Sequence, residues 1–343
     1  MALRLIEMFL PAEENLDRVQ DLLKDHPALG IWQENLSENH SLIKVLVDAE
    51  ETEEVIDILE KYYSNRNDFR ILILPVEATL PRPEKKEDSA LKEQEAQSRQ
   101  GSSSAKVSRI SREELYSDIV DTTKLSKVYI VLVVLSSIVA AVGILRDSVA
   151  VIIGAMVIAP LLGPNIALSF ATTLGDMNMV KRALKANLVG LLVAFIFSAL
   201  IGFIFEINPE VSELSSRTNV GLADVALALA SGSAGVLSFT AGVGSAIVGV
   251  MVAVALLPPL VSFGMLLGSA HFSLALGAML LLLVNVICVN LAGVTTFLAQ
   301  GIRPKTWWEA DRAKKATRVA ILLWTFLLLV LIAAILLSQK KAT

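Results

Sequence analysis

The sequence has little charge and few of the side chains that usually build catalytic or metal centres. Only 19% of its 343 residues are Asp, Glu, Lys or Arg, against about 25% in an average soluble protein. It has three histidines and one cysteine, Cys288, so it cannot form an internal disulfide, and no Cys/His spacing typical of a metal site occurs. We expect Cys288 to be a small buried hydrophobic residue, and we expect no metal and no cofactor.

A signal peptide and a nucleic-acid-binding surface are also missing from the sequence. The first apolar run ends at Glu7 and is soon followed by Pro11, which predicts that the N-terminal region stays in the cytoplasm. The net charge is only −4, and no stripe of cations interleaved with aromatic residues occurs. Nucleic acid is therefore not expected as a partner.

What the sequence does have is a sharp division between a charged and an apolar part. Residues 1–125 are rich in charge, whereas residues 126–343 contain long apolar runs. A bilayer is crossed by about 20 mostly apolar residues in a helix. We predict about seven spans, near residues 126–145, 148–174, 186–206, 220–242, 243–269, 274–299 and 319–338. The flanking lysines and arginines predict a multi-pass protein of the plasma (inner) membrane, with the N-terminus in the cytoplasm and the C-terminus outside.

Residues 1–76 alternate between the patterns of strands and helices. The predicted order is strand, helix, strand, strand, helix, strand, which is the ferredoxin-like α+β plan (βαββαβ). Domains of this plan, ACT-type regulatory modules among them, bind small effectors or pair through exposed edge strands. We therefore expect either a small-molecule effector site or a homo-oligomer contact in this cytoplasmic domain, and analogy of fold does not choose between them.

The segment between this domain and the membrane has two parts. Residues 77–110 contain prolines, charges and serines without recurring apolar positions, which predicts a disordered tether. Ser111 and Glu114 have the spacing of a capping box. We interpret 111–124 as an amphipathic helix at the membrane surface, or alternatively as an extension of the first span, and 125–343 as the transmembrane domain.

Two stretches of the membrane domain repeat each other. Residues 152–164 align with 247–259 without a gap, and the repeat motif pairs Gly154 with Gly249 and Met156 with Met251. The same offset carries the first predicted span onto the fourth and the third onto the sixth. Because the predicted topology gives these spans opposite directions, we predict a 3+3 inverted repeat followed by one extra helix. Inverted repeats are typical of secondary transporters.

Prolines interrupt the second and fifth predicted spans at neighbouring places of the repeat. A proline in a helix removes one N–H and frees the carbonyl four residues earlier, and lipid cannot satisfy that carbonyl. We expect both spans to be broken and polar side chains to gather at the breaks. The candidates for a substrate pathway are Pro160, Pro164, Asn165, Pro258, Pro259, Asn285, Asn290, Ser231, Ser233, Ser238 and Thr240. Each hydroxyl, and each asparagine of the sixth span, could instead be an ordinary helix-packing residue.

Two functions fit this pattern. The first is a membrane transporter or channel for a small solute or ion, with a cytoplasmic regulatory or oligomerisation domain. The alternative is a membrane-anchored sensor or scaffold whose soluble domain carries the function. An enzyme is not expected, because no pair of intramembrane His, Asp or Glu residues offers acid–base or metal chemistry. The scarcity of intramembrane charge argues against proton coupling and leaves a neutral solute, or an ion held by backbone carbonyls.

The stretch 147–164, with Gly-Ala-Met-Val-Ile-Ala-Pro-Leu at residues 154–161, resembles the prokaryotic membrane family catalogued as domain of unknown function 389. Residues 255–259, Ala-Leu-Leu-Pro-Pro, are similar to the second motif of that family, and the N-terminal domain suits its architecture. The resemblance covers chiefly residues 126–300. It implies a polytopic membrane protein, and it implies no particular substrate or catalytic residue.

Overall fold

The chain divides into two compact units, Met1–Leu115 and Tyr116–Thr343. The computed structural model describes residues 3–11, 16–24, 26, 28–37, 40–63, 69–76, 79, 110–241, 245–304 and 307–342, and of residues 245–255, 307–312 and 337–342 it describes the backbone alone. The predicted tether, residues 77–110, therefore falls almost wholly outside the described residues.

The first unit is an antiparallel four-stranded sheet with two helices. Its elements follow the order β1 (Leu3–Pro11), α1 (Leu16–Leu22), β2 (Ala28–Ser37), β3 (His40–Asp48), α2 (Thr52–Tyr63) and β4 (Arg70–Val76). The strands lie side by side as β2-β3-β1-β4. Alternate residues of β1 and β3, such as Ile6, Met8 and Val45, are fully buried together with Leu59 and Tyr63 of α2. The predicted order of strands and helices is confirmed.

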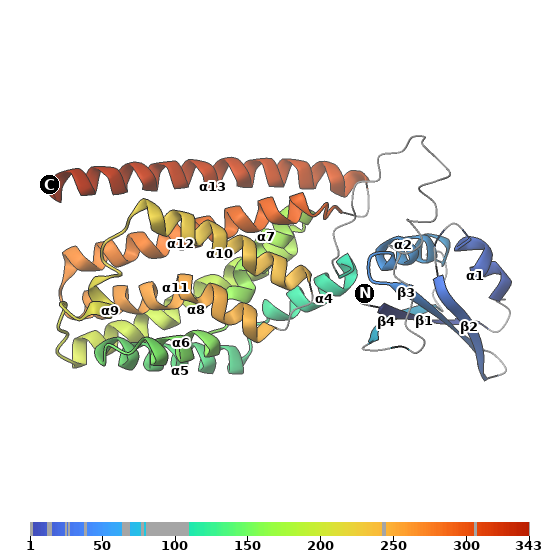
Figure 1. The fold of residues 1–343 in the computed structure, drawn as a ribbon, viewed down its shortest axis with the longest axis horizontal. Helices are drawn as coiled ribbons and strands as arrows, with labels where there is room; N and C mark the ends of the chain where they lie inside the picture. The colour runs from blue at the N-terminus through green and yellow to red at the C-terminus, as the bar shows by residue number, and fades with distance from the viewer. Residues whose placement is uncertain are drawn as a thin grey trace, which may run out of the picture. The chain divides into compact units, whose positions relative to one another are not determined.

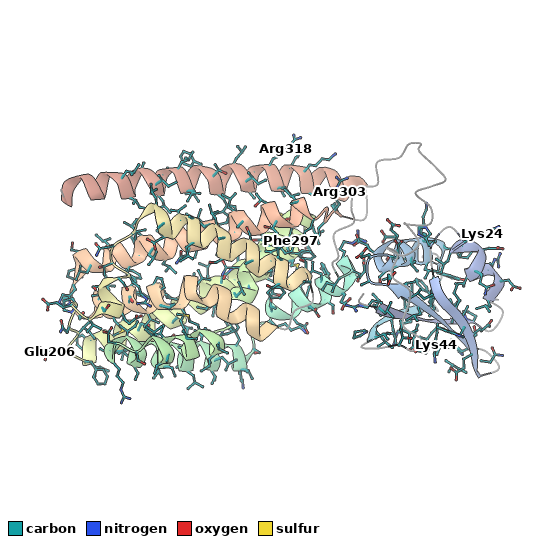
Figure 2. All side chains as sticks on the ribbon, viewed as in Figure 1. Lys24, Lys44, Glu206, Phe297, Arg303 and Arg318 are labelled. Atoms are coloured by element: carbon teal, nitrogen blue, oxygen red, sulfur yellow. The ribbon has the colours of Figure 1, made fainter. Side chains whose placement is uncertain are left out.

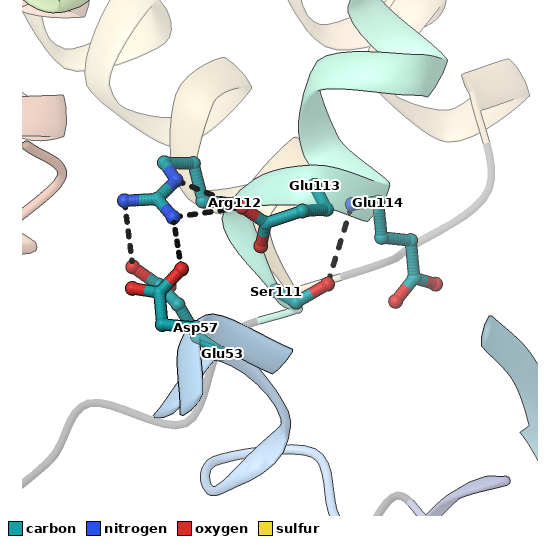
Figure 3. Close-up of polar contacts among 6 residues, drawn as sticks. All are labelled: Glu53, Asp57, Ser111, Arg112, Glu113 and Glu114. Carbon is teal, nitrogen blue, oxygen red and sulfur yellow. Dashed lines mark hydrogen bonds and ion pairs between the residues drawn. The ribbon is translucent and has the colours of Figure 1, made fainter. Parts of the chain in front are cut away.

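A buried arginine holds the start of the next helix, α4 (Arg112–Thr122), within the first unit. Arg112 pairs with Glu113 at 2.8 Å, with Asp57 of α2 at 2.9 Å and with Glu53 of α2 at 3.7 Å (Figure 3). Burial opposes the charged form of Arg112, but the carboxylates of Glu113, Asp57 and Glu53 outweigh it, so the pKa of Arg112 lies above its ordinary value.

The predicted capping box of α4 is only half formed. The Ser111 hydroxyl accepts a hydrogen bond from the Glu114 backbone N–H at 3.2 Å. The Glu114 carboxylate pairs instead with the guanidinium of Arg4 at 2.9 Å. The helix predicted over 111–124 therefore exists, and its place at a membrane surface stays a prediction.

The second unit is helical. After α4, which contains the division between the units, its helices are α5 (Lys127–Leu145), α6 (Val149–Ile158), α7 (Leu162–Leu174), α8 (Met177–Ile204), α9 (Ser212–Ser215), α10 (Leu222–Thr240), α11 (Ser245–Gly268), α12 (Phe272–Ala299) and α13 (Trp307–Ala342). Five of them are long and apolar enough to cross a membrane, and six spans result if α6 and α7 are counted as one bent span. The remaining predicted span coincides with α11, whose apolar part Leu256–Gly268 alone is described with side chains, and it stays a prediction.

Several long helices begin or end near α9, at one end of this unit (Figure 1). The chain enters α9 from α8 and leaves it for α10. Asp147, directly after α5, accepts a hydrogen bond from the Glu213 backbone N–H at 2.8 Å. Gly277, near the start of α12, lies against the Thr218 carbonyl so closely that a Cβ would collide with it. Thus α5 and α8 end, and α10 and α12 begin, at the same end of the unit. Figure 2 shows Glu206 at this end and Arg303 at the opposite end.

The helix boundaries follow the offset of 95 residues that aligns position 152 with 247. This offset carries Lys127–Leu145 (α5) onto Leu222–Thr240 (α10), and Met177–Ile204 (α8) onto Phe272–Ala299 (α12), at both ends of each helix. It also carries Gly175 onto Ala270, and both have a positive φ, 73° and 62°.

The two proline-bearing segments differ in the structure. Helices α6 and α7 are bent by 52° at Ala159–Leu161, as the break predicted near Pro160 requires. The break predicted near Pro258 and Pro259 is wrong for the described backbone, because both prolines lie inside the single helix α11. Helices in membranes tolerate proline when neighbouring helices satisfy the freed carbonyls, and both prolines are buried among neighbours.

Candidate functional site

The break between α6 and α7 is caused locally by proline. Ala159 has the extended backbone (φ −70°, ψ 118°) that is favoured before a proline, and Pro160 has no N–H with which to continue α6. Helix α7 then begins at Leu162 without a side-chain cap. Its first turn carries Asn165, whose amide supplies polar groups at a point where the backbone pattern is interrupted.

Three buried asparagines form a hydrogen-bonded cluster at this break, which we call the amide cluster (Asn165, Asn187 and Asn290). The Asn165 side-chain amide donates to the Leu161 carbonyl at 2.9 Å and to the Asn187 side-chain oxygen at 2.8 Å. The Asn290 amide donates to the Asn165 side-chain oxygen at 3.0 Å and to the Val286 carbonyl at 2.8 Å. The cluster therefore joins α7, α8 and α12.

The amide cluster is shielded from solvent. Asn290 is fully buried, and Asn165 and Asn187 are buried nearly as completely. The Ser169 hydroxyl, one turn further along α7, donates to the Asn290 backbone carbonyl at 3.3 Å and lies 3.4 Å from its side-chain oxygen. Interhelical hydrogen bonds of this kind contribute on average about 0.6 kcal/mol each in membrane proteins. Their larger effect is specificity, because an amide without its partner would be costly in this place.

A cavity of about 500 Å³ lies beside the break, and we call it the break cavity. Ala159, Pro160 and Gly163 line it from the break, Tyr129 from α5, and Lys124 from the segment before α5. The Tyr129 hydroxyl donates to the Ala186 carbonyl at 3.1 Å. Because Ala186 precedes Asn187, this wall of the cavity connects directly to the amide cluster.

A second cavity, of about 210 Å³, lies among α10, α11 and α12, and we call it the α10–α12 cavity. Arg217 and Asp224 line it near α9, and Ser231, Pro259 and Asn285 line it further along the helices. Asn285 precedes Asn290 by five residues on α12, which is about 7.5 Å along the helix axis. Each cavity thus shares a helix with the amide cluster, since Gly163 of α7 lines the break cavity and Asn285 of α12 lines the α10–α12 cavity.

The charged side chains that line the two cavities make contacts within the protein. Arg217 pairs with Glu213 at 2.7 Å, and Asp224 accepts a hydrogen bond from the Gly221 N–H at 2.8 Å. Lys124 in the break cavity pairs with Asp121 at 2.6 Å. Apart from these charged residues, hydroxyl, amide and apolar groups line the cavities.

The structure brings together many of the predicted pathway residues. Asn165 and Asn290 are directly bonded, Pro160 lines the break cavity, and Ser231, Pro259 and Asn285 line the α10–α12 cavity. Pro164 and Pro258 are buried within α7 and α11 without lining either cavity.

The other predicted residues lie elsewhere. Ser238 donates to the Ala234 carbonyl at 2.9 Å, and Thr240 donates to the Leu237 carbonyl and accepts from Gln300. Ser233 is half-buried on α10. Of the repeat motif, Met156 is buried, an added Cβ at Gly154 would meet nothing within 4 Å, and Gly249 and Met251 lie where only the backbone is described.

Sequence reasoning missed Asn187, Tyr129 and Ser169. A signal for Asn187 was present, since it is an amide inside the third predicted span. Tyr129 is an aromatic residue at the start of the first span, and nothing in its spacing distinguishes it from an interfacial residue.

Comparison with known proteins places these residues in a family. A model described as Domain of unknown function (DUF389) matches residues 156–291, a stretch that includes Pro160 and the whole amide cluster. An uncharacterized protein of Methanocaldococcus jannaschii is 35% identical over 337 residues, which cover 98% of this chain and 99% of that protein. No solved structure matches the chain. The chain therefore belongs to the family described as Domain of unknown function (DUF389).

Proposed function

We propose that this protein is a membrane transporter or channel for a small neutral polar solute, and that the amide cluster closes its pathway between the two cavities. The observation that carries this proposal is the position of the cluster. Three buried amides meet where α6 and α7 are broken, with the break cavity reached through Tyr129 and the α10–α12 cavity reached through Asn285. Alternating access requires that a central site never open to both sides of the membrane at once, and a buried cluster between two separate cavities would provide that barrier.

Two pairs of helices related by one sequence offset support the proposal. Helices α5 and α10 share their boundaries under one offset, as do α8 and α12, and the members of each pair start from opposite ends of the unit. We infer that the second unit consists of two inverted halves followed by α13. Two such halves can rock against each other around a site at their junction.

The chemistry of the cavities favours a neutral solute. The amide cluster contains no charged residue, Lys124 and Arg217 pair with carboxylates, and Asp224 accepts a backbone hydrogen bond at the start of α10. An ion would have to leave its hydration shell for amide and hydroxyl oxygens alone. A solute with hydroxyl or amide groups could instead exchange hydrogen bonds with Asn285, Asn290 and Ser231 one at a time.

Flux through proteoliposomes tests the proposal. Purified protein is reconstituted, and permeation of glycerol and of urea is followed by light scattering after rapid mixing. We expect faster permeation of at least one of these probes than through protein-free liposomes, and altered flux on changing Asn290 or Asn285 to Leu. Asn178→Leu is the matched control, because Asn178 is exposed at the start of α8 and lines neither cavity.

Two results would contradict the proposal. Equal permeability of protein-containing and protein-free liposomes for both probes would remove the neutral-solute pathway. If the flux through Asn290→Leu and Asn285→Leu equalled that through the control Asn178→Leu, Asn290 and Asn285 would not belong to the pathway. The first result would leave the alternative from the sequence, a membrane-anchored sensor or scaffold.

A further inference from the structure

Three potential metal ligands meet in the first unit. His26 lies between α1 and β2, Glu51 directly precedes α2, and Glu54 lies in the first turn of α2. One ligand atom from each lies within 4.8 Å of the others, and the His26 Nδ1 is 3.6 Å from a Glu54 carboxylate oxygen. Among the described residues this is the one group of this kind.

The histidine distinguishes this group from ordinary acidic residues at a helix start. Carboxylates are common in the first turn, because the helix dipole favours negative charge there. Glu53, in the same turn, pairs with Arg112 and is not part of this group (Figure 3). His26 comes from a different segment and brings a ring nitrogen to Glu51 and Glu54. Glu51 is only 9% exposed, so one carboxylate of the set is held away from bulk water.

We propose that His26, Glu51 and Glu54 bind a divalent transition-metal ion of the zinc type. Imidazole nitrogen and carboxylate oxygen together suit Zn²⁺ and its neighbours in the first transition series, whereas Mg²⁺ and Ca²⁺ prefer sites made of oxygen alone. Metal–ligand bonds of about 2.0–2.2 Å place ligand atoms roughly 3.5 Å apart. The half-exposed Glu54 side chain can make the small rotation that this spacing requires.

The site has the character of an exchangeable one. Three protein ligands leave at least one position for water, and Glu54 faces solvent, so a bound ion could leave without unfolding of the unit. The regulatory effector that the fold suggests for this domain would then be a metal ion. This inference does not depend on the proposed transport activity.

Titration of the full-length protein tests the site. The detergent-solubilised protein is freed of metal with a chelator and titrated with Zn²⁺ by calorimetry, and with Co²⁺ by visible absorption. We expect one saturable site, and an association constant that falls at least about tenfold in His26→Gln and in Glu51→Gln. The visible band of bound Co²⁺ should be lost in His26→Gln.

Matched controls separate the site from surface binding. His40→Gln and Glu50→Gln change an exposed histidine and the exposed neighbour of Glu51, and both should bind Zn²⁺ as the unchanged protein does. Melting curves without metal verify that each variant is folded. Binding that is equal in His26→Gln and His40→Gln would overturn the proposal, as would Mg²⁺ competing with Zn²⁺ at similar concentration.

Discussion

At the scale of single residues, the buried hydrogen bonds of the amide cluster make its three side chains depend on one another. Each of its three side chains is buried, and each makes at least one hydrogen bond to another member. A buried polar group that loses its partner costs about 1–3 kcal/mol. The cluster is therefore stable only as a set, and any opening of a pathway through it must replace its hydrogen bonds with those of a solute or water.

This mutual dependence predicts non-additive mutations. Asn165→Ala and Asn290→Ala should each lower the free energy of unfolding in detergent by about 1–3 kcal/mol. The double variant should lose less than the sum of the two, by at least about 0.5 kcal/mol, because the second change removes an amide that the first has already left unpaired. A denaturant titration of all four proteins measures this coupling. As a control, the free energies of unfolding lost in Asn165→Ala and in Asn178→Ala should add in the double variant of these two residues. A coupling there as large as that between Asn165 and Asn290 would contradict the mutual dependence of the cluster.

At the scale of helices, close backbone contact joins α8 and α11. A Cβ on Gly202 would collide with the backbone carbonyl of Met265, and one on Gly268 would collide with that of Ala199. Small residues let membrane helices approach in this way, which compensates for the absence of a hydrophobic driving force between them in lipid.

Two glycines make a matched test of this contact. Gly202→Ala should push α8 from α11 and lower the free energy of unfolding by about 1–3 kcal/mol. Gly154→Ala, on α6, adds a Cβ that meets nothing within 4 Å, and stability should stay the same or rise by up to about 1 kcal/mol. Thermal melting in detergent compares the two. If Gly154→Ala lowered the stability as much as Gly202→Ala, the loss in Gly202→Ala could not be attributed to the contact between α8 and α11.

The helices themselves were largely predictable from the sequence, and their partners were not. The spans predicted over 126–145, 220–242 and 274–299 end within two residues of α5, α10 and α12, because apolar runs bounded by polar residues locate such helices directly. Helix α8 begins nine residues earlier than predicted. Its cap is Asp176, which accepts two backbone N–H bonds at 3.0 Å, and its first turns carry charges that a hydropathy pattern excludes.

Side-chain clusters depend on contacts between distant segments, which spacing alone does not reveal. Asn165 and Asn290 were candidates, but their direct hydrogen bond requires that α7 pack against α12. The bond from Asn165 to Asn187 requires in addition that α7 pack against α8. His26 and Glu51 are separated in the chain by the strands β2 and β3, so no short motif joins them. The break predicted at Pro258 and Pro259 does not occur in α11. Whether prolines break a membrane helix depends on the neighbouring helices that can satisfy the freed carbonyls, and the sequence does not show these neighbours.

At the scale of the whole molecule, the inverted halves that we propose require a definite sidedness of every loop. Helices α5 and α8 end at the α9 end, and α10 and α12 begin there. Arg146, after α5, and Glu210, in the α9 segment, should therefore face one side of the membrane. Lys181, near the start of α8, and Arg303, after α12, should face the other. The lysine and arginine bias of the loops predicts that Lys181 and Arg303 are cytoplasmic.

Cysteine labelling tests this arrangement with little disturbance, because the single native cysteine, Cys288, is fully buried and can be replaced by Ala. Cysteines are placed singly at the exposed positions Arg146, Glu210, Lys181 and Arg303. A membrane-impermeant maleimide should label the first two on intact cells and the last two only after permeabilisation. Labelling of all four from the same side, or of Arg146 and Glu210 from different sides, is incompatible with inverted halves, because helices that share boundaries would then run in the same direction. A full exchange of the two pairs would instead keep the inversion and reverse the protein in the membrane.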